Sequence, residues 1–328
     1  MRQIIALSLI ILFSLPAQSQ ELYRYTFQEP HMGTYFKIII YAEDRQFAID
    51  VAKAAYDSVA SLNQVLSDYL PHSEVSEFNN APVNTPRKIS PALFTAIKKS
   101  LQLSEWTNGA FDITVGPLVK LWRKARKENE LPGRLDLQSA LHSVGYQHLQ
   151  LSDSAVIRNK PGMQLDFGGI GKGMALSAAM RVINTAGISR VLLDAGGDIL
   201  LGEAPPDKSG WEVVIGLFEQ DKKFQQKMLL SNMAVTSSGD LYQFIEIEGK
   251  RYSHIVDPST GLGITGQKRS TIIGPDAATA DALASAICIM KPGKARKLLK
   301  KFPEYQALLF ASGSRNQVKV PIGKNILK

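Results

Sequence analysis

Residues 166–173 read DFGGIGKG, which places four glycines and one lysine within eight positions. Glycine lets a backbone approach phosphate oxygens closely and lysine adds a point charge, so the stretch indicates a phosphate-binding loop. Two familiar loops do not fit the spacing. A Walker A loop has Ser or Thr after its Gly-Lys pair, where this chain has Gly173, and the dinucleotide fingerprint has a third glycine where this chain has Met174. The stretch therefore predicts a phosphate loop of another kind.

The sequence on both sides of this loop predicts an α+β fold. Residues 172–185 predict a helix that ends at Gly187, and residues 190–201 predict a strand interrupted by Gly196 and Gly197. Other helices are expected over 51–66, from the Ser90–Pro91 cap pair to Asn108, near 135–144, over 277–290 and near 294–302. Other strands are expected over 36–41, 148–157 and 306–311 and between 211 and 273. An exposed loop is expected over 124–134. Strands and helices alternate irregularly, with hairpin-like spacing. We therefore expect a single large domain of mixed or antiparallel sheets with packed helices, rather than a doubly wound parallel sheet.

The N-terminus predicts export. Arg2 precedes an apolar run from Ile4 to Leu15, and a small-x-small site follows at residues 17–19. A membrane anchor is the alternative, but the run holds about a dozen residues and a spanning helix needs roughly 20. We expect a signal peptide over residues 1–19, a mature domain over residues 20–328 and a periplasmic location.

Charge and cysteine usage limit the classes of partner. Cys288 is the one cysteine, so we expect neither an internal disulfide nor a lipid anchor near the cleavage site. The net charge of +8 favours anionic ligands or a membrane surface, although a generally basic surface explains it equally well. The segment KARKLLKK, residues 294–301, carries Leu298 and Leu299 at helical spacing and predicts a solvated helix face. Because no aromatic residues are interleaved with these cations, nucleic-acid binding is not expected.

A helix near the C-terminus carries candidate metal ligands. In DAATADALASA, residues 276–286, Asp281 and Ser285 are four apart and share one helix face. Both offer hard oxygen atoms, and with a carbonyl from a glycine turn they suit Mg²⁺, which completes its shell with water and substrate phosphates. The alternative is an aspartate that only complements the helix dipole.

Two further segments have both a catalytic and a structural interpretation. In HIVDPSTG, residues 254–261, His254 precedes Asp257 by three positions in a turn. A histidine titrates near neutral pH and can deprotonate a hydroxyl, but it can also be a hydrogen-bonded structural residue. Residues 109–114, GAFDIT, are either a substrate-facing turn or a helix end entering a strand.

Taken together, these segments resemble the ApbE family of FAD:protein FMN transferases. The matching segments follow the family order and cover nearly all of the mature chain: MGT at 32–34, LSDY at 66–69, SEVS at 73–76 with Asn79, GAFDITVGPL at 109–118 with Trp122, LDFGGIGKG at 165–173, GGD at 196–198, VTSSGD at 235–240, HIVDPSTG at 254–261 and ADALASA at 280–286. The resemblance implies an ApbE-like fold related to the T-fold.

The resemblance also implies roles for individual residues. The glycine loop would bind the pyrophosphate of FAD, with Lys172 facing the phosphates and Tyr69 stacking near a ring of FAD. The other implied FAD-pocket residues are Met32, Ala110, Phe111, Asp112, Asp166, His254 and Ile255. The implied Mg²⁺ ligands are the Gly169 carbonyl, Asp281 and Ser285. His254 would be the general base, with support from Asp257.

Four positions depart from the family pattern. Gly171 stands where the family usually has alanine, Asp194 where asparagine often precedes the Gly-Gly-Asp, and Ser285 where threonine is usual. Ser238 adds a residue to the usual Thr-Ser-Gly. Serine keeps the hydroxyl of threonine, so we expect metal binding to survive.

The resemblance implies an exported, Mg²⁺-dependent enzyme that transfers FMN from FAD to a threonine or serine hydroxyl of a partner and releases AMP. Known acceptors of the family are flavoprotein subunits of membrane respiratory complexes, so the protein would be peripheral to the membrane at most. One alternative is an FAD pyrophosphatase, which uses water as the acceptor. A second is a protein that binds or stores FAD without turnover, against which Asp281, Ser285 and His254 argue.

Overall fold

The computed structural model describes residues 21–216, 225–240, 243–312 and 317–322. The predicted signal peptide lies outside the described residues. None of the described helices is both long enough and apolar enough to cross a membrane.

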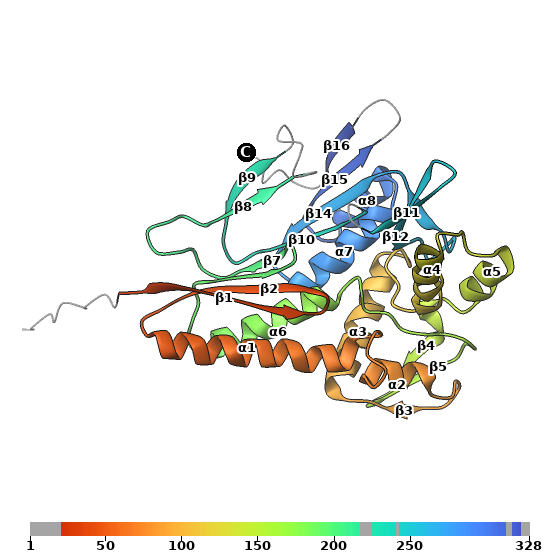
Figure 1. The fold of residues 1–328 in the computed structure, drawn as a ribbon, viewed down its shortest axis with the longest axis horizontal. Helices are drawn as coiled ribbons and strands as arrows, with labels where there is room; N and C mark the ends of the chain where they lie inside the picture. The colour runs from red at the N-terminus through yellow and green to blue at the C-terminus, as the bar shows by residue number, and fades with distance from the viewer. Residues whose placement is uncertain (1–20, 217–224, 241–242, 313–316, 323–328) are drawn as a thin grey trace, which may run out of the picture.

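An antiparallel sheet of eight strands forms the backbone of the fold (Figure 1). Its order is β1-β2-β6-β7-β10-β14-β15-β16, and each neighbouring pair runs antiparallel. The strands span Tyr23–His31 (β1), Thr34–Ala42 (β2), Val191–Ala195 (β6), Asp198–Leu201 (β7), Ala234–Gly239 (β10), Lys268–Gly274 (β14), Gln306–Ser312 (β15) and Gln317–Ile322 (β16). This sheet, with helices packed on it, confirms the predicted α+β class.

Both faces of the sheet are covered, which explains why its second strand is almost continuously apolar. Ile38 and Ile40 of β2 face a core made with helices α1 (Arg45–Leu66) and α6 (Gly171–Thr185), which lie below β1 and β2 in Figure 1. Ile39 faces a second core under the hairpin of β8 (Trp211–Ile215) and β9 (Gln226–Leu230). Alternate residues of one strand are therefore buried on opposite sides.

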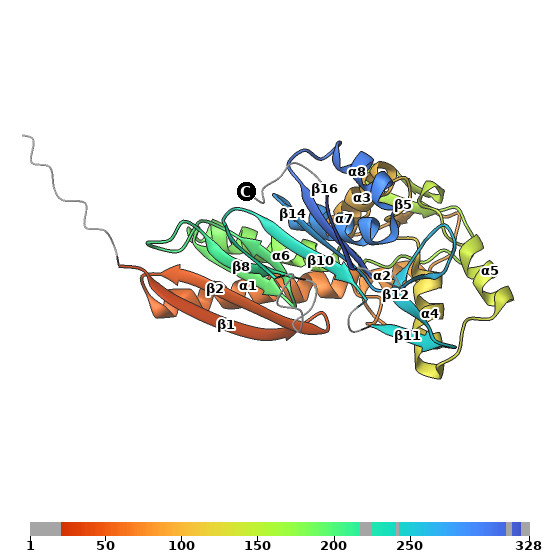
Figure 2. The same cartoon turned by 90° about the horizontal axis from the view of Figure 1, so that it is seen from above.

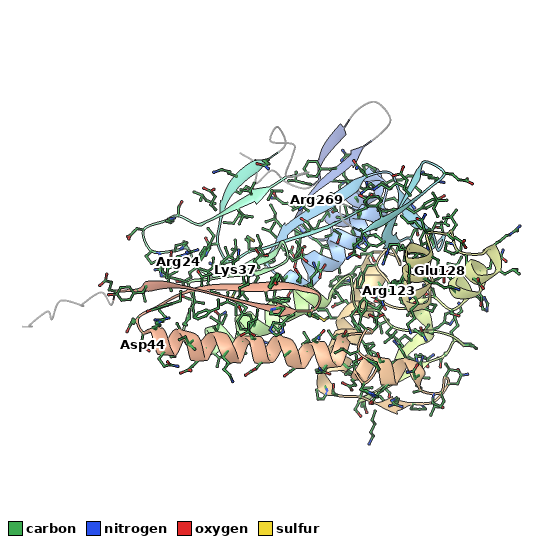
Figure 3. All side chains as sticks on the ribbon, in the orientation of Figure 1. Arg24, Lys37, Asp44, Arg123, Glu128 and Arg269 are labelled. Atoms are coloured by element: carbon green, nitrogen blue, oxygen red, sulfur yellow. The ribbon has the colours of Figure 1, made fainter. Side chains whose placement is uncertain are left out.

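Helix starts follow capping residues in the sequence. Asp44, labelled in Figure 3, accepts a hydrogen bond of 2.7 Å from the backbone N of Phe47 at the start of α1. Ser90 caps α3 (Pro91–Trp106), which has proline at its first position as predicted. Asp276 caps α7 (Ala277–Ile289) in the same way.

A second group of elements packs against the C-terminal end of α1 and along one face of α7. Helices α2 (Glu74–Asn80) and α3 share a core with the α7 residues Ala278, Ala282 and Ala286. A small sheet of β3 (Arg87–Lys88), β5 (Ala155–Arg158) and β4 (Leu149–Leu151) lies beside them. Because α7 contributes buried residues to this core and to that of the large sheet, the two parts form one folded unit.

The third part carries the histidine segment. Strands β11 (Phe244–Ile247), β12 (Lys250–Val256) and β13 (Gly263–Thr265) form an antiparallel sheet that packs on α4 (Gly116–Glu128), with α5 (Arg134–His142) beside it. Trp122 of α4 packs on Tyr252 of β12, with ring centroids 5.6 Å apart, and donates from Nε1 to the Gly261 carbonyl. Helix α4 thus anchors the turn that follows β12.

Two predictions about local structure were wrong. Residues 190–201 form a hairpin of β6 and β7 rather than one interrupted strand, because Gly196 and Gly197 both have positive φ and make a tight two-residue turn. The expected loop over 124–134 is helical up to Glu128, because Ala125 is buried against the β11–β12 sheet while the charged residues cover the exposed side. Asn129 caps the C-terminal end of the helix in a left-handed conformation.

Candidate functional site

The glycine-rich stretch is a tight turn that leads into α6. The Asp166 carboxylate accepts from the Gly168 N–H at 2.7 Å, and the Phe167 carbonyl accepts from Gly171 N at 2.7 Å. Helix α6 begins at Gly171, so its first N–H groups and its dipole face the turn. The turn is therefore built to receive an anion at its helix end.

The turn packs directly on α7, and this contact brings the predicted metal ligands together. A Cβ placed on Gly169 would lie 3.0 Å from Ser285 Oγ, and Gly173 N donates to the Asp281 carboxylate at 3.1 Å. Asp281 and Ser285 lie one turn apart on α7. The Gly169 segment and the two α7 side chains therefore converge, as the sequence predicts.

The donor set fits a hard cation that keeps part of its water shell. Asp281 is 3% exposed, and its second carboxylate oxygen receives no hydrogen bond from the described residues. Burial and the charge of Asp198 raise the pKa of Asp281 to about 7, and the charge of Lys172 opposes this rise. The positive charge of Lys172 therefore does not fully balance the negative charge of the Asp281 carboxylate. The described residues contain no cluster of three or more His, Cys, Asp or Glu side chains suited to a metal. One carboxylate, one hydroxyl and one carbonyl suit Mg²⁺, which binds few protein ligands.

Lys172 lies beside these ligands and is held by a second acidic residue. Its ammonium group donates to the Asp198 carboxylate, whose other oxygen accepts from Ser237 N at 2.9 Å. Burial favours the neutral amine, but the charges of Asp198 and Asp281 outweigh it and raise the pKa of Lys172. Lys172 therefore stays charged in a partly buried position beside the α6 N-terminus.

Tyr69 lies on the surface beside a cluster of charged side chains. The ring is 72% exposed, and the Arg123 guanidinium lies 3.9 Å from its centroid on one side. Arg123, labelled in Figure 3, forms ion pairs with Asp68 and with Asp166, the latter at 3.0 Å. Burial and the charge of Asp68, opposed by Arg123, raise the pKa of Asp166 to about 6. Arg123 thus ties the Tyr69 segment to the glycine turn.

Met32 and Phe111 both lie close to the glycine turn. Met32, at the tip of the β1–β2 hairpin, has its methyl group 3.7 Å from a Cβ placed on Gly171. Phe111 is buried, with a ring carbon 3.5 Å from a Cβ placed on Gly169. The structure therefore brings both predicted FAD-pocket residues to the glycine turn.

Ala110 and Asp112 make packing contacts and hydrogen bonds within the fold. Ala110 is partly buried against the core that α2 and α3 share. The Asp112 carboxylate accepts from Thr114 N and Oγ1 and from Tyr146 N. Burial raises the pKa of Asp112, and these hydrogen bonds oppose the rise. Residues 109–114 thus form a braced turn, without a strand, and Asp112 fixes its shape.

His254 has a defined tautomer and a free nitrogen. Nδ1 lies 3.0 Å from the Gln243 carbonyl, which can only accept, so Nδ1 carries the proton. Nε2 has no hydrogen-bond partner among the described residues. Burial lowers the pKa of His254, with the charges of Arg126 and Lys172 acting in the same direction and the Gln243 hydrogen bond opposing them. The imidazole is therefore neutral at pH 7, with a lone pair on Nε2.

The neighbours of His254 hold the following turn. Ile255 N donates to Ser253 Oγ at 3.0 Å. The Asp257 carboxylate accepts from Ser259 N at 2.8 Å and from Ser259 Oγ, and its backbone carbonyl accepts from Gly261 N. Asp257 therefore contacts Ser259 rather than His254 and braces the turn.

Sequence reasoning did not assign three residues that contribute to the site. The sequence does not point to Arg123, because the charged segment that follows it predicts a loop. Asp198, which pairs with Lys172, and Ser238, whose Oγ lies 3.0 Å from Ser285 Oγ, lie in the quoted segments GGD and VTSSGD. The two segments contain Asp198 and Ser238 but do not show what these residues do. Their contacts, Lys172 and Ser285, lie far away in the sequence.

Comparison with known proteins gives one consistent family. A family model described as the ApbE family matches residues 32–309. The FAD:protein FMN transferase of Escherichia coli is 28% identical over 282 residues, which cover 82% of this chain and 79% of that protein. The FAD:protein FMN transferase of Vibrio cholerae is 30% identical over 233 residues, which cover 70% of each protein.

Solved structures agree with the sequence relatives. The apo form of the flavinyl transferase ApbE of Pseudomonas stutzeri has a TM-score of 0.83 at 25% identity and covers 92% of this chain and 95% of that one. The ApbE protein of Thermotoga maritima has a TM-score of 0.79 at 29% identity, with 90% and 97% covered. The likeness therefore extends over nearly the whole described chain.

Proposed function

The chain belongs to the ApbE family, and on this premise we propose that it transfers FMN from FAD to a threonine or serine hydroxyl of an acceptor protein and releases AMP. Its curated relatives are named FAD:protein FMN transferases. The observation that carries the proposal is the convergence of Lys172, Asp281, Ser285 and the Gly169 segment at the start of α6. This arrangement suits the pyrophosphate of a dinucleotide.

The chain's own groups would bind and orient FAD. Lys172 and the first N–H groups of α6 would contact pyrophosphate oxygens, and Asp198 would keep the ammonium group in position. Tyr69 has an exposed ring with Arg123 on one side, which leaves its other side for a ring of FAD. Met32 and Phe111 would line the same pocket.

Asp281, Ser285 and the Gly169 carbonyl would hold Mg²⁺, because together they offer a buried carboxylate with an unbonded oxygen, a hydroxyl and a backbone oxygen. When bound, the ion would neutralise pyrophosphate charge. Ser238, which shares a hydrogen bond with Ser285, would fix the direction of that hydroxyl.

His254 would act as the general base. Its Nε2 lone pair is free and its lowered pKa keeps it neutral at pH 7, so it can take the proton of the acceptor hydroxyl. The hydroxyl oxygen then forms a bond to the phosphorus of the FMN half. The bond from that phosphorus to the AMP oxygen breaks, and the proton on His254 passes to solvent or to AMP. Asp257 would contribute by holding the turn after β12.

Location and acceptor are further parts of the proposal. The apolar run after Arg2 and the site before Gln20 support export to the periplasm and removal of residues 1–19. Flavoprotein subunits of membrane respiratory complexes are the proposed acceptors. N-terminal sequencing of the exported protein should find Gln20 first, and an intact Met1 in the membrane fraction would contradict the location.

The proposed reaction is tested by incubating the purified protein with FAD and Mg²⁺, with and without an acceptor that carries the target threonine. Covalent flavin on the acceptor is followed by in-gel fluorescence. A fluorescent acceptor band that disappears with EDTA supports the proposal. Free FMN and AMP without a labelled acceptor would indicate a pyrophosphatase, and bound FAD without AMP would indicate a binding protein.

A further inference from the structure

Helix α8 (Pro292–Leu299) and its flanking residues present a strongly basic surface. Every exposed residue from 291 to 301 is a lysine or arginine, apart from Pro292 and Gly293. We refer to these six cations as the α8 basic face: Lys291, Lys294, Arg296, Lys297, Lys300 and Lys301.

The orientation of this face is fixed by the opposite side of the helix. Ala295, Leu298 and Leu299 are buried in the core of the large sheet, and Phe302 joins the same core directly after the helix. The cations are therefore held outward by packing, because the helix cannot rotate without exposing these apolar side chains.

The α8 basic face lies in a segment of the sequence that is poor in acidic residues. Among the described residues, none of the six cations forms an ion pair. Glu304 is the sole acidic residue of the sequence from Ala282 to Lys328. Such an excess of one sign attracts a polyanion and is screened by salt.

An exposed tryptophan lies beside this face. Trp106, at the end of α3, is 38% exposed and packs edge-on against Phe302, with ring centroids 5.2 Å apart. Trp122 and Trp211 are buried, at 1% and 5% exposed. An indole next to lysines is typical of the interface between water and lipid headgroups, where the ring makes apolar contacts and the N–H finds a hydrogen-bond acceptor.

The composition favours a diffuse anionic surface over a phosphate held in a fixed position. Five of the six cations are lysines, which act as mobile point charges, whereas recognition of single phosphates favours the rigid fork of arginine.

We propose that the α8 basic face, with Trp106 beside it, docks the protein on an anionic lipid surface. Figure 2 shows α8 at one edge of the molecule, across from α4 and β11, so docking would leave those two elements directed away from the lipid. The proposal does not depend on the transfer reaction, because it concerns a separate surface and is tested without FAD.

The test measures binding to vesicles of phosphatidylcholine with and without phosphatidylglycerol, by sedimentation. The variant is Lys294→Gln, Lys297→Gln and Lys301→Gln together. A matched control, Lys53→Gln, Lys208→Gln and Lys227→Gln, removes the same charge from exposed positions elsewhere. All proteins share one N-terminus, so an attached leader would affect each equally, and circular dichroism checks their folding.

Wild type should bind only the anionic vesicles and should dissociate in high salt. Each cation near an anionic surface is worth about fivefold in affinity, so the α8 variant should bind about a hundredfold more weakly. The control variant should lose much less. Equal loss in both variants, or no binding by wild type, would overturn the proposal.

Trp106 provides an independent readout. Brominated lipids should quench its fluorescence in anionic vesicles, and Trp106→Phe should abolish that quenching because the other two indoles are buried. An unquenched Trp106 on vesicles that sediment with the protein would contradict the docking geometry. If the protein bound a short DNA duplex but no vesicles, the partner of the α8 basic face would be a nucleic acid and the proposal would be overturned.

Discussion

Replacing Gly173 with alanine should force α6 away from α7, whereas the same replacement at Gly171, two positions earlier in α6, should not. A Cβ at Gly173 would lie 2.4 Å from the Ala277 carbonyl oxygen and 2.7 Å from the Ala278 Cα, both backbone atoms. At Gly171 the nearest atom is the methyl group of Met32, at an ordinary contact distance of 3.7 Å.

The expected magnitude follows from these contacts. Overpacking a core typically costs about 1–3 kcal/mol. Moving the helix also removes the Gly173 N–H from the buried Asp281 carboxylate, which costs about 1–3 kcal/mol more. Alanine has a higher helix propensity than glycine, which stabilises α6 by about 0.5–1 kcal/mol and offsets part of this cost. We therefore expect Gly173→Ala to lower the free energy of unfolding by roughly 3 kcal/mol, and Gly171→Ala to change it by less than about 1 kcal/mol.

Urea unfolding of the two variants and the wild type, followed by circular dichroism, measures this difference. Gly171→Ala is the matched control, because it adds the same methyl group to the same helix. A Gly173→Ala protein as stable as wild type would refute the account of the α6–α7 contact. So would a Gly171→Ala protein that is the less stable of the two.

Three further outcomes are expected. Tyr69→Ala should weaken FAD binding about tenfold or more in a fluorescence titration, since ring stacking is worth roughly 1–3 kcal/mol, while the exposed Tyr35→Ala should leave it unchanged. His254→Asn should retain FAD binding but slow transfer about 10²–10⁴-fold. Because burial lowers the His254 pKa, the wild-type transfer rate at saturating Mg²⁺ should begin to fall at a lower pH than a free imidazole would give. Unchanged transfer by His254→Asn would exclude His254 as the base. Asp281→Asn should abolish Mg²⁺ binding in calorimetry while keeping the fold, since its amide oxygen can still accept from Gly173, and unchanged Mg²⁺ affinity would place the metal elsewhere.

The sequence predicted those parts of the fold that depend on local patterns. The Ser90 cap, the helix after the glycine stretch and helix α7 were all recognisable from capping residues and from apolar or small side chains. The β6–β7 hairpin was missed because the same two glycines fit a break in one strand. The length of α4 was missed because its charge pattern resembles a loop, and only the packing of Trp122 and Ala125 against β12 shows the buried side.

For the site, residue types were predictable and their partners were not. The glycine turn and the Asp281–Ser285 spacing predicted that these segments would meet, and the structure places the glycine turn beside Asp281 and Ser285. Their role as metal ligands stays a prediction. The Lys172–Asp198 pair joins residues 26 positions apart, and the contact of Arg123 with Asp166 spans 43. Such pairs depend on the tertiary arrangement, which no local pattern encodes.

The central claim is that FAD is cleaved by transfer to a protein hydroxyl. It is tested most directly by counting AMP released against FMN bound covalently to the acceptor in one reaction, by chromatography and by intact-protein mass. The account predicts one AMP for each FMN attached, with little free FMN. AMP matched by free FMN, or an acceptor of unchanged mass, would contradict it.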